Sequence, residues 1–152
     1  MQTQQQTAAE TGLTLERARQ LFERTPDGKP DYTIVHEFYH PDLRFQDPLQ
    51  ELRGRDAFIE MSDSFVGKVY DFEAKIDQAA QTGNVIFLQW TMHYRFGKPT
   101  NPVMRSEGTT KLELNEQGQV VLHRDYFDMW GDAIRSFKPA RGLYDRLMKK
   151  MG

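Results

Sequence analysis

The stretch NVIFLQWTMHYRFG, residues 84–97, decides the fold. From Leu88 to Phe96, apolar and polar side chains alternate along it. Successive side chains of a β-strand point to opposite faces, so this pattern predicts a long strand with one apolar and one polar face. The apolar set is Leu88, Trp90, Met92, Tyr94 and Phe96, and the polar set is Gln89, Thr91, His93 and Arg95.

Three more extended runs flank this strand, at about residues 69–80, 103–114 and 119–130. The strings TGN, GKP and NEQG separate the four runs, and each is typical of the turn in a β-hairpin. We therefore predict four consecutive strands that form an antiparallel meander.

The chain before residue 67 has helical periodicity instead. Helices are predicted after Thr14 and Asp31, which are favourable N-cap residues, and after Gly54. Pro41 is predicted to end the second helix, and a short strand follows at 43–46. Helices followed by long strands indicate an α+β domain. We expect a cone-shaped, curved antiparallel sheet whose concave face is covered by the N-terminal helices.

Length and composition limit the classes of function. The 152 residues suit one domain, placed at 13–152 after a polar tail, 1–12, that we expect to be disordered. The sequence has no cysteine, which excludes disulfides, thiol nucleophiles and thiolate metal sites. Its net charge of -2 predicts no general affinity for nucleic acid or for a membrane. The tail lacks the apolar run of a signal peptide, so we expect a cytoplasmic protein.

The C-terminal segment 131–152 is basic, with six Lys or Arg side chains against two Asp, a charge of +4. Leu143, Leu147 and Met151 repeat at a spacing of four, which indicates an amphipathic helix. We expect its apolar stripe to dock on the domain or on a partner subunit. A role at a membrane surface or with an acidic partner is the alternative.

Three strings carry a family resemblance: FYHPDLRFQDP at 38–48, GRDA at 54–57 and HRDYFD at 123–128. In this order and spacing they resemble the nuclear transport factor 2-like superfamily. Within it they look like the SnoaL-like proteins, which are relatives of ketosteroid isomerases and limonene epoxide hydrolases. The resemblance implies a conical domain with a pocket for a small apolar ligand between sheet and helices, usually in a homodimer.

Asp125 matches the carboxylate that acts in acid/base catalysis in the epoxide hydrolases. Other catalytic positions of those enzymes fall at Trp90, Met92, Phe45 and Asp47, where the side chains of this sequence differ from theirs. The resemblance therefore supports an acid/base carboxylate but not epoxide hydrolysis by that route.

The strand that carries Asp125 places His123 and Phe127 on the same face, because residues two apart share a face. On the concave side Asp125 would be desolvated among apolar side chains, which suits a general acid or base. His123 could then share its proton. The alternative is a structural ion pair of Asp125 with Arg124 or Arg105.

Two further residues complete the candidate catalytic set. Tyr39 could place its hydroxyl in the pocket as a donor, and the alternative is a core tyrosine. Asp47 precedes Pro48 near the pocket mouth, where turn formation is the alternative. The predicted substrate-binding residues are Phe45, Trp90, Met92, Tyr94 and Phe127.

The string HEFYH at 36–40 matches the zinc-peptidase pattern HExxH, with Glu60 as a candidate third ligand. Pro41 would end the helix at the second histidine, so we predict no metal site and no cofactor. We expect a SnoaL-like protein that binds a small hydrophobic molecule, with cofactor-free acid/base catalysis centred on Asp125. Isomerisation, dehydration, cyclisation and hydrolysis all remain open. The alternative is a non-catalytic module of the same fold, for ligand binding or dimerisation.

Overall fold

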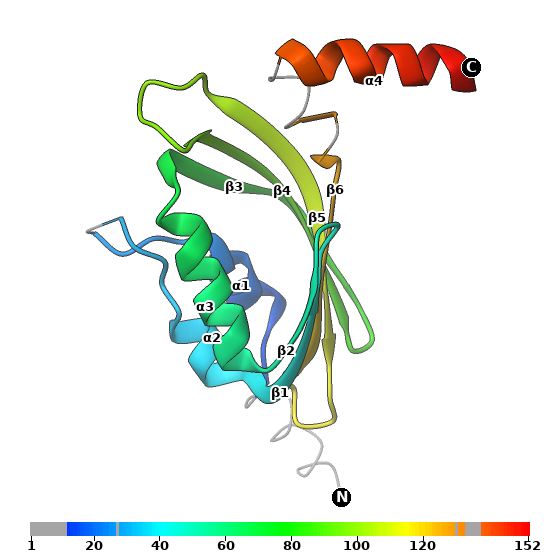
Figure 1. Ribbon diagram of the computed structural model, residues 1–152. Helices are drawn as coiled ribbons and strands as arrows, with labels where there is room; N and C mark the ends of the chain where they lie inside the picture. The colour runs from blue at the N-terminus through cyan, green and yellow to red at the C-terminus, as the bar shows by residue number, and fades with distance from the viewer. Residues whose placement is uncertain (1–11, 27, 130, 133–137) are drawn as a thin grey trace, which may run out of the picture.

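The computed structural model describes residues 12–26, 28–129, 131–132 and 138–152. The tail expected at 1–12 lies outside these residues except for Gly12, so its disorder stays a prediction. Figure 1 shows a strongly curved sheet with helices against one side and the C-terminal helix at one end of the molecule. The predicted class, α+β with a curved sheet, is confirmed.

Six strands form one sheet: β1 (Tyr39–Gln46), β2 (Glu51–Arg53), β3 (Val69–Thr82), β4 (Val85–Phe96), β5 (Met104–Leu114) and β6 (Val120–Phe127). Their order across the sheet is β2-β1-β6-β5-β4-β3. The last four strands follow one another as an antiparallel meander, as the sequence predicts.

The first strand departs from the prediction in two ways. It begins at Tyr39, so the preceding helix ends at Phe38 and not at Pro41, which lies within the strand. β1 also pairs in parallel with β6, and in antiparallel with the unpredicted β2, so the sheet is mixed. Pro41 lies where the register with β6 is interrupted, and such an irregular position tolerates a residue without an N–H group.

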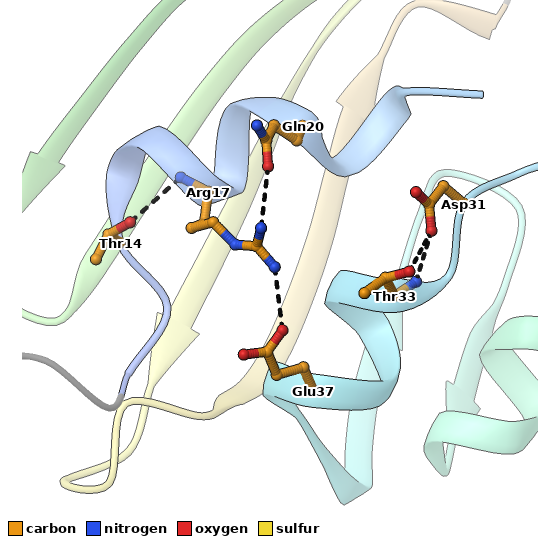
Figure 2. A network of polar contacts seen from close by, with 6 residues as sticks. All are labelled: Thr14, Arg17, Gln20, Asp31, Thr33 and Glu37. Carbon is orange, nitrogen blue, oxygen red and sulfur yellow. Dashed lines mark hydrogen bonds and ion pairs between the residues drawn. The ribbon is translucent and has the colours of Figure 1, made fainter. Parts of the chain in front are cut away.

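The helices are α1 (Leu15–Ala18), the 3₁₀ helix η1 (Arg19–Phe22), α2 (Thr33–Phe38), α3 (Arg55–Val66) and α4 (Lys138–Met151). Thr14 caps α1 as predicted, because its hydroxyl accepts a hydrogen bond from Arg17 N at 3.2 Å. Asp31 accepts from Thr33 N at 2.9 Å in the turn that leads into α2 (Figure 2).

Arg17 joins the first helical segment to α2 (Figure 2). Its guanidinium donates to Glu37 Oε2 at 3.0 Å and to Gln20 Oε1 at 3.4 Å. Both charged side chains are about half exposed, so the ion pair contributes at most about 1 kcal/mol. We therefore attribute the packing of this helical layer mainly to its apolar side.

The hydrophobic core lies between the helices α1 to α3 and the concave face of the sheet. Each large apolar side chain buried there contributes about 2 kcal/mol. In β4 the core takes Ile86 and Leu88, whereas Met92 and Tyr94 farther along the same face are only partly buried. The core therefore fills one end of the concave face and leaves the other end open. Its main members are Ile34, Val35, Phe38, Leu43, Phe58, Ile86, Leu88, Leu112 and Val120.

The C-terminal helix α4 has no buried residue. Its apolar stripe, Leu143, Leu147 and Met151, is exposed, so the expected docking of this stripe on the domain is not observed. Docking on a partner subunit stays a prediction. Among the described residues, no helix has both the length and the apolar character needed to cross a membrane.

Candidate active site

A cavity of about 1200 Å³ opens on the concave face of the sheet, between the strands and the helices η1 and α3. Its volume suits a small organic molecule. All five residues predicted to bind substrate belong to its mainly apolar wall, namely Phe45, Trp90, Met92, Tyr94 and Phe127. On β6 the wall continues with His123 and Asp125, so the strand faces assigned from alternation are correct.

Asp125 lies at the cavity wall with 18% of its side chain exposed. Its Oδ1 accepts a hydrogen bond from Thr110 Oγ1 at 2.5 Å and lies 3.0 Å from His123 Nε2. Its Oδ2 has no hydrogen-bond partner among the described residues. One carboxylate oxygen is therefore anchored, and the other is available to a molecule in the cavity.

Trp90 decides which way the Thr110 hydroxyl points. The indole nitrogen can only donate, and Trp90 Nε1 donates to Thr110 Oγ1 at 2.9 Å. Thr110 is fully buried, so its single hydroxyl proton is left for Asp125 Oδ1. Trp90 thus acts on Asp125 through Thr110.

Tyr39 determines which nitrogen of the His123 imidazole carries the proton. Its hydroxyl lies 2.9 Å from His123 Nδ1. Burial, followed by the negative charge of Asp125, raises the pKa of Tyr39 well above its ordinary value. The phenol therefore keeps its proton and donates it to Nδ1, which leaves the imidazole proton on Nε2. The Nε2–H group then donates to Asp125 Oδ1.

One continuous series of hydrogen bonds, which we call the Asp125 network, joins Trp90, Thr110, Asp125, His123 and Tyr39. Starting from Trp90 at one end and from Tyr39 at the other, every hydrogen bond is donated in the direction of Asp125. Hydrogen bonds to a charged acceptor are stronger than those between neutral groups, so this polarity fits an ionised carboxylate.

Three aromatic rings enclose the His123 imidazole, which is only 2% exposed. The ring centroids of Phe58, Phe45 and Tyr39 lie 5.0, 5.2 and 5.9 Å from that of the imidazole. Close packing on several sides restricts rotation of the ring. His123 Nε2 is thus held toward Asp125 before any ligand binds.

Asp125 does not form the ion pair with an arginine that was the alternative to an acid/base role. Arg124 lies over the ring of Tyr126, with its guanidinium carbon 4.7 Å from the centroid. Arg105 pairs with Glu107 on its own strand. Only the contact with His123 could give Asp125 an ionic partner among the described residues.

For two candidate catalytic residues, Tyr39 and Asp47, the geometry favours the alternative role that the sequence left open. Tyr39 is not part of the cavity wall, because it lies behind His123 and reaches a ligand only through it. Asp47 is at the wall, but its Oδ1 accepts from Leu49 N at 2.7 Å and from Gln50 N at 2.9 Å. The structure therefore gives Asp47 the turn-forming role.

Thr110 carries no sequence signal that singles it out. Alternation along β5 places it on the same face as Ser106 and Leu112, but a threonine is an ordinary residue in a strand. Only its contacts with Trp90 and Asp125 reveal its position in the network.

The zinc-peptidase string is divided between two elements. His36 belongs to α2, whereas His40 belongs to β1 and its Nδ1 accepts from Asp42 N at 3.1 Å. Among the residues that the structure describes, no three His, Asp or Glu side chains come together as a metal site.

A curved sheet and covering helices that enclose an apolar cavity define the class of conical, nuclear transport factor 2-like α+β domains. The sequence profile of the SnoaL-like domain matches residues 15–123, and the chain belongs to this family. A search among curated proteins found no match.

Solved structures agree with this class. A protein from Jannaschia sp. CCS1, provisionally assigned as a SnoaL-like polyketide cyclase, is 17% identical with a TM-score of 0.65, covering 82% of this chain and 87% of its own. A protein of ketosteroid isomerase-like fold from Catenulispora acidiphila DSM 44928 is 12% identical with a TM-score of 0.58, covering 74% and 82%. AclR from Streptomyces galilaeus, provisionally a hydroxylase, is 15% identical with a TM-score of 0.54, covering 64% and 76%. At these identities the similarity concerns the fold.

Proposed function

We propose that the protein binds a small, largely apolar molecule in the cavity and acts on it by acid/base chemistry, with Asp125 as the base. The observation that carries this proposal is the placement of Asp125. Two donors hold its Oδ1, while its Oδ2 is unpartnered among the described residues at the wall of an apolar cavity. A base held in one orientation needs no rearrangement before it meets its substrate.

The proposed step removes a proton from a carbon next to a carbonyl group of the ligand. Asp125 Oδ2 takes the proton, and the electrons of the broken C–H bond move to the carbonyl oxygen as an enolate. The proton then returns from Asp125 to another atom of the ligand. Isomerisation, dehydration and cyclisation can each proceed through such a step. The apolar wall supports it by keeping water away from the reacting carbon.

The Asp125 network serves this step by positioning. Thr110 and His123 fix the plane of the carboxyl group through Oδ1, so Oδ2 keeps one direction. Tyr39 keeps the imidazole in the tautomer that donates to Asp125. In this scheme His123 remains neutral, and no buried cation has to be formed.

Tyr94 offers the ligand a hydrogen-bond donor in another part of the cavity, because the strand register places it two strands across and six residues along the sheet from Asp125. It lies on the cavity wall, where its ring packs edge-on against Phe65 with centroids 5.7 Å apart. Its hydroxyl makes no hydrogen bond within the described part of the chain, so it can donate to a ligand.

The names of the structural neighbours support the same kind of chemistry, since they include a cyclase and an isomerase-like fold. A homodimer, cofactor-free catalysis and a cytoplasmic location stay predictions. The second candidate function is a non-catalytic binding module, which would keep the cavity but make no use of Asp125 Oδ2.

Exchange of carbon-bound hydrogen tests the proposal before the natural substrate is known. An enolisable bicyclic ketone such as beta-tetralone is incubated with the protein in heavy water, and loss of its α-proton signal is followed by NMR. We expect the protein to accelerate exchange, and Asp125→Asn to slow it by about a hundredfold or more, the usual contribution of a general base. Asp128→Asn is the matched control, because Asp128 is tied to Gly131 N and lies outside the cavity wall.

Equal exchange with the protein and with Asp125→Asn would refute the catalytic role of Asp125. If the ketone still binds both proteins, the non-catalytic binding module becomes the better account. Binding is measured in the same samples through the line widths and shifts of the ketone.

A further inference from the structure

Arg24 is a charged residue in the cavity wall that the proposed chemistry does not use. Its guanidinium carbon lies 4.0 Å from the centroid of the Phe72 ring, a cation–π contact. Its Nη1 is buried without a hydrogen-bond partner. Among the described residues, no carboxylate forms an ion pair with it.

The fold fixes the positions of both Arg24 and Phe72. The backbone of Arg24 forms a bridge with Pro30 across the loop between η1 and α2. On β3 the register shifts between Tyr70 and Glu73, so Asp71 and Phe72 share one position opposite β4. This β-bulge turns Asp71 outward, where it pairs with Arg95 at 2.7 Å, and turns Phe72 into the cavity.

The bulge contains a backbone conformation that is costly for its residue. Asp71 has φ 51°, in the left-handed region that non-glycine residues seldom adopt. A strained position of this kind is retained where the surrounding structure requires it. Here the strain places an aromatic ring directly beneath the Arg24 guanidinium.

The position of Arg24 is unfavourable for stability. Burial lowers the pKa of Arg24, and the neighbouring Tyr32 only partly offsets this effect. The guanidinium remains charged at neutral pH, and a partly buried charge without an anionic partner is unfavourable. An acceptor group on a ligand would supply that partner and recover the cost.

Other charges near the cavity do not satisfy Arg24. Tyr32 donates to Asp63 at 2.7 Å, which occupies that carboxylate on α3. Asp31 is engaged by Thr33, and Asp47 by the turn described above. The remaining wall carboxylates, apart from Asp125, are Glu23 and Glu60, which are exposed and therefore screened by solvent, as is the wall cation Lys68.

We propose that Arg24 binds an anionic group of the ligand, a carboxylate or another oxyanion, and so determines which apolar molecules the cavity accepts. This inference rests on the proposed function, because it assigns the ligand of the same cavity. Arg24 contacts β3, whereas Asp125 is on β6, and β4 and β5 lie between these strands. Three inter-strand spacings amount to about 14 Å across the sheet, and the strand register offsets Phe72 from Asp125 by about six residues along it. The ligand is therefore an elongated apolar molecule with its acidic group at one end and its reactive carbon toward the other.

Two fluorescent probes that differ by one charge test the inference. Anilinonaphthalene sulfonate carries a sulfonate on the ring system that phenylnaphthylamine presents without charge, and both brighten in apolar cavities. We expect Arg24→Met to weaken binding of the sulfonate about tenfold, the value of a charge-assisted hydrogen bond, and to leave the neutral probe unchanged. Arg24→Lys should lose less, because it keeps the charge but not the planar fork of donors.

Arg19→Met is the matched control, since it removes the same charge five residues earlier from an exposed side chain outside the cavity wall. It should affect neither probe. Binding of the neutral probe shows that each variant retains a folded cavity. If Arg24→Met weakens both probes equally, or neither, the inference fails while the proposed function stands. If neither probe binds the unaltered protein, both fail.

Discussion

Replacing Thr110 by valine removes one buried hydroxyl from the centre of the Asp125 network and hardly changes the volume of the side chain. The hydroxyl accepts from Trp90 Nε1 at 2.9 Å and donates to Asp125 Oδ1 at 2.5 Å. Its loss leaves the indole N–H without an acceptor in a residue that is only 4% exposed, which costs about 1–3 kcal/mol. The lost bond to Asp125 adds about 1.5–3 kcal/mol, and the extra apolar burial of valine offsets about 1 kcal/mol. We expect Thr110→Val to lower the free energy of unfolding by about 1.5–5 kcal/mol.

A double-mutant cycle separates the two losses. In a Trp90→Phe background the indole N–H is absent, so Thr110→Val loses only its bond to Asp125. Its cost should then be smaller by about 1–3 kcal/mol, which is the coupling between Trp90 and Thr110. Thr110→Ser is the control, because it keeps the hydroxyl and should cost only about 1 kcal/mol for the lost methyl group.

Urea denaturation followed by circular dichroism gives these free energies from the midpoints and slopes of the transitions. A cost of Thr110→Val below about 0.5 kcal/mol would show that the two hydrogen bonds carry no stability. An equal cost in both backgrounds would show that Trp90 does not depend on Thr110. Either result would refute the directional network that orients Asp125.

Two further predictions concern the same network. Gly108→Ala should lower the free energy of unfolding by more than about 2 kcal/mol and shift the fluorescence of Trp90. A Cβ at Gly108 would lie 2.3 Å from Trp90 Cζ2 and would push the indole away from Thr110. An unchanged emission spectrum would contradict this. The free energy of unfolding should also fall above about pH 10, by up to about 1.4 kcal/mol per pH unit for Tyr39. Burial raises the pKa of Tyr39, so in this pH range the unfolded chain binds fewer protons than the folded one. Urea midpoints across this pH range should decline less steeply for Tyr39→Phe, and equal slopes for the two proteins would show that Tyr39 titrates as it does in the unfolded chain.

The strands of the meander and their inward faces could be read from the sequence, because side-chain alternation is a local property. The period of two along residues 84–97 places Trp90, Met92 and Tyr94 on one face, and the structure finds all three in the cavity wall. The same rule places His123 and Asp125 together on the last strand. That spacing allows a hydrogen bond between the two side chains, and only the structure establishes it, at 3.0 Å.

The parallel pairing of β1 with β6 could not be read in this way. Strand pairing joins segments that are distant in the chain, and no local pattern in the sequence of β1 indicates that it pairs with β6. The early end of α2 has a related cause. Tyr39 begins a strand because its ring is buried against Phe58 and its hydroxyl reaches His123, contacts that exist only in the folded chain.

By itself, the sequence determined the class of the fold, the run of strands and the residues that face the cavity, because periodicity and turn chemistry act over a few neighbouring residues. Only the tertiary structure decided the direction of each hydrogen bond at Asp125 and the position of Arg24 over Phe72. These contacts join β1, β3, β4, β5, β6 and the loop before α2, so they exist only once the sheet has curved and the helices have closed over it. A donor acquires its direction from the acceptors around it, and those acceptors are brought together by the whole fold.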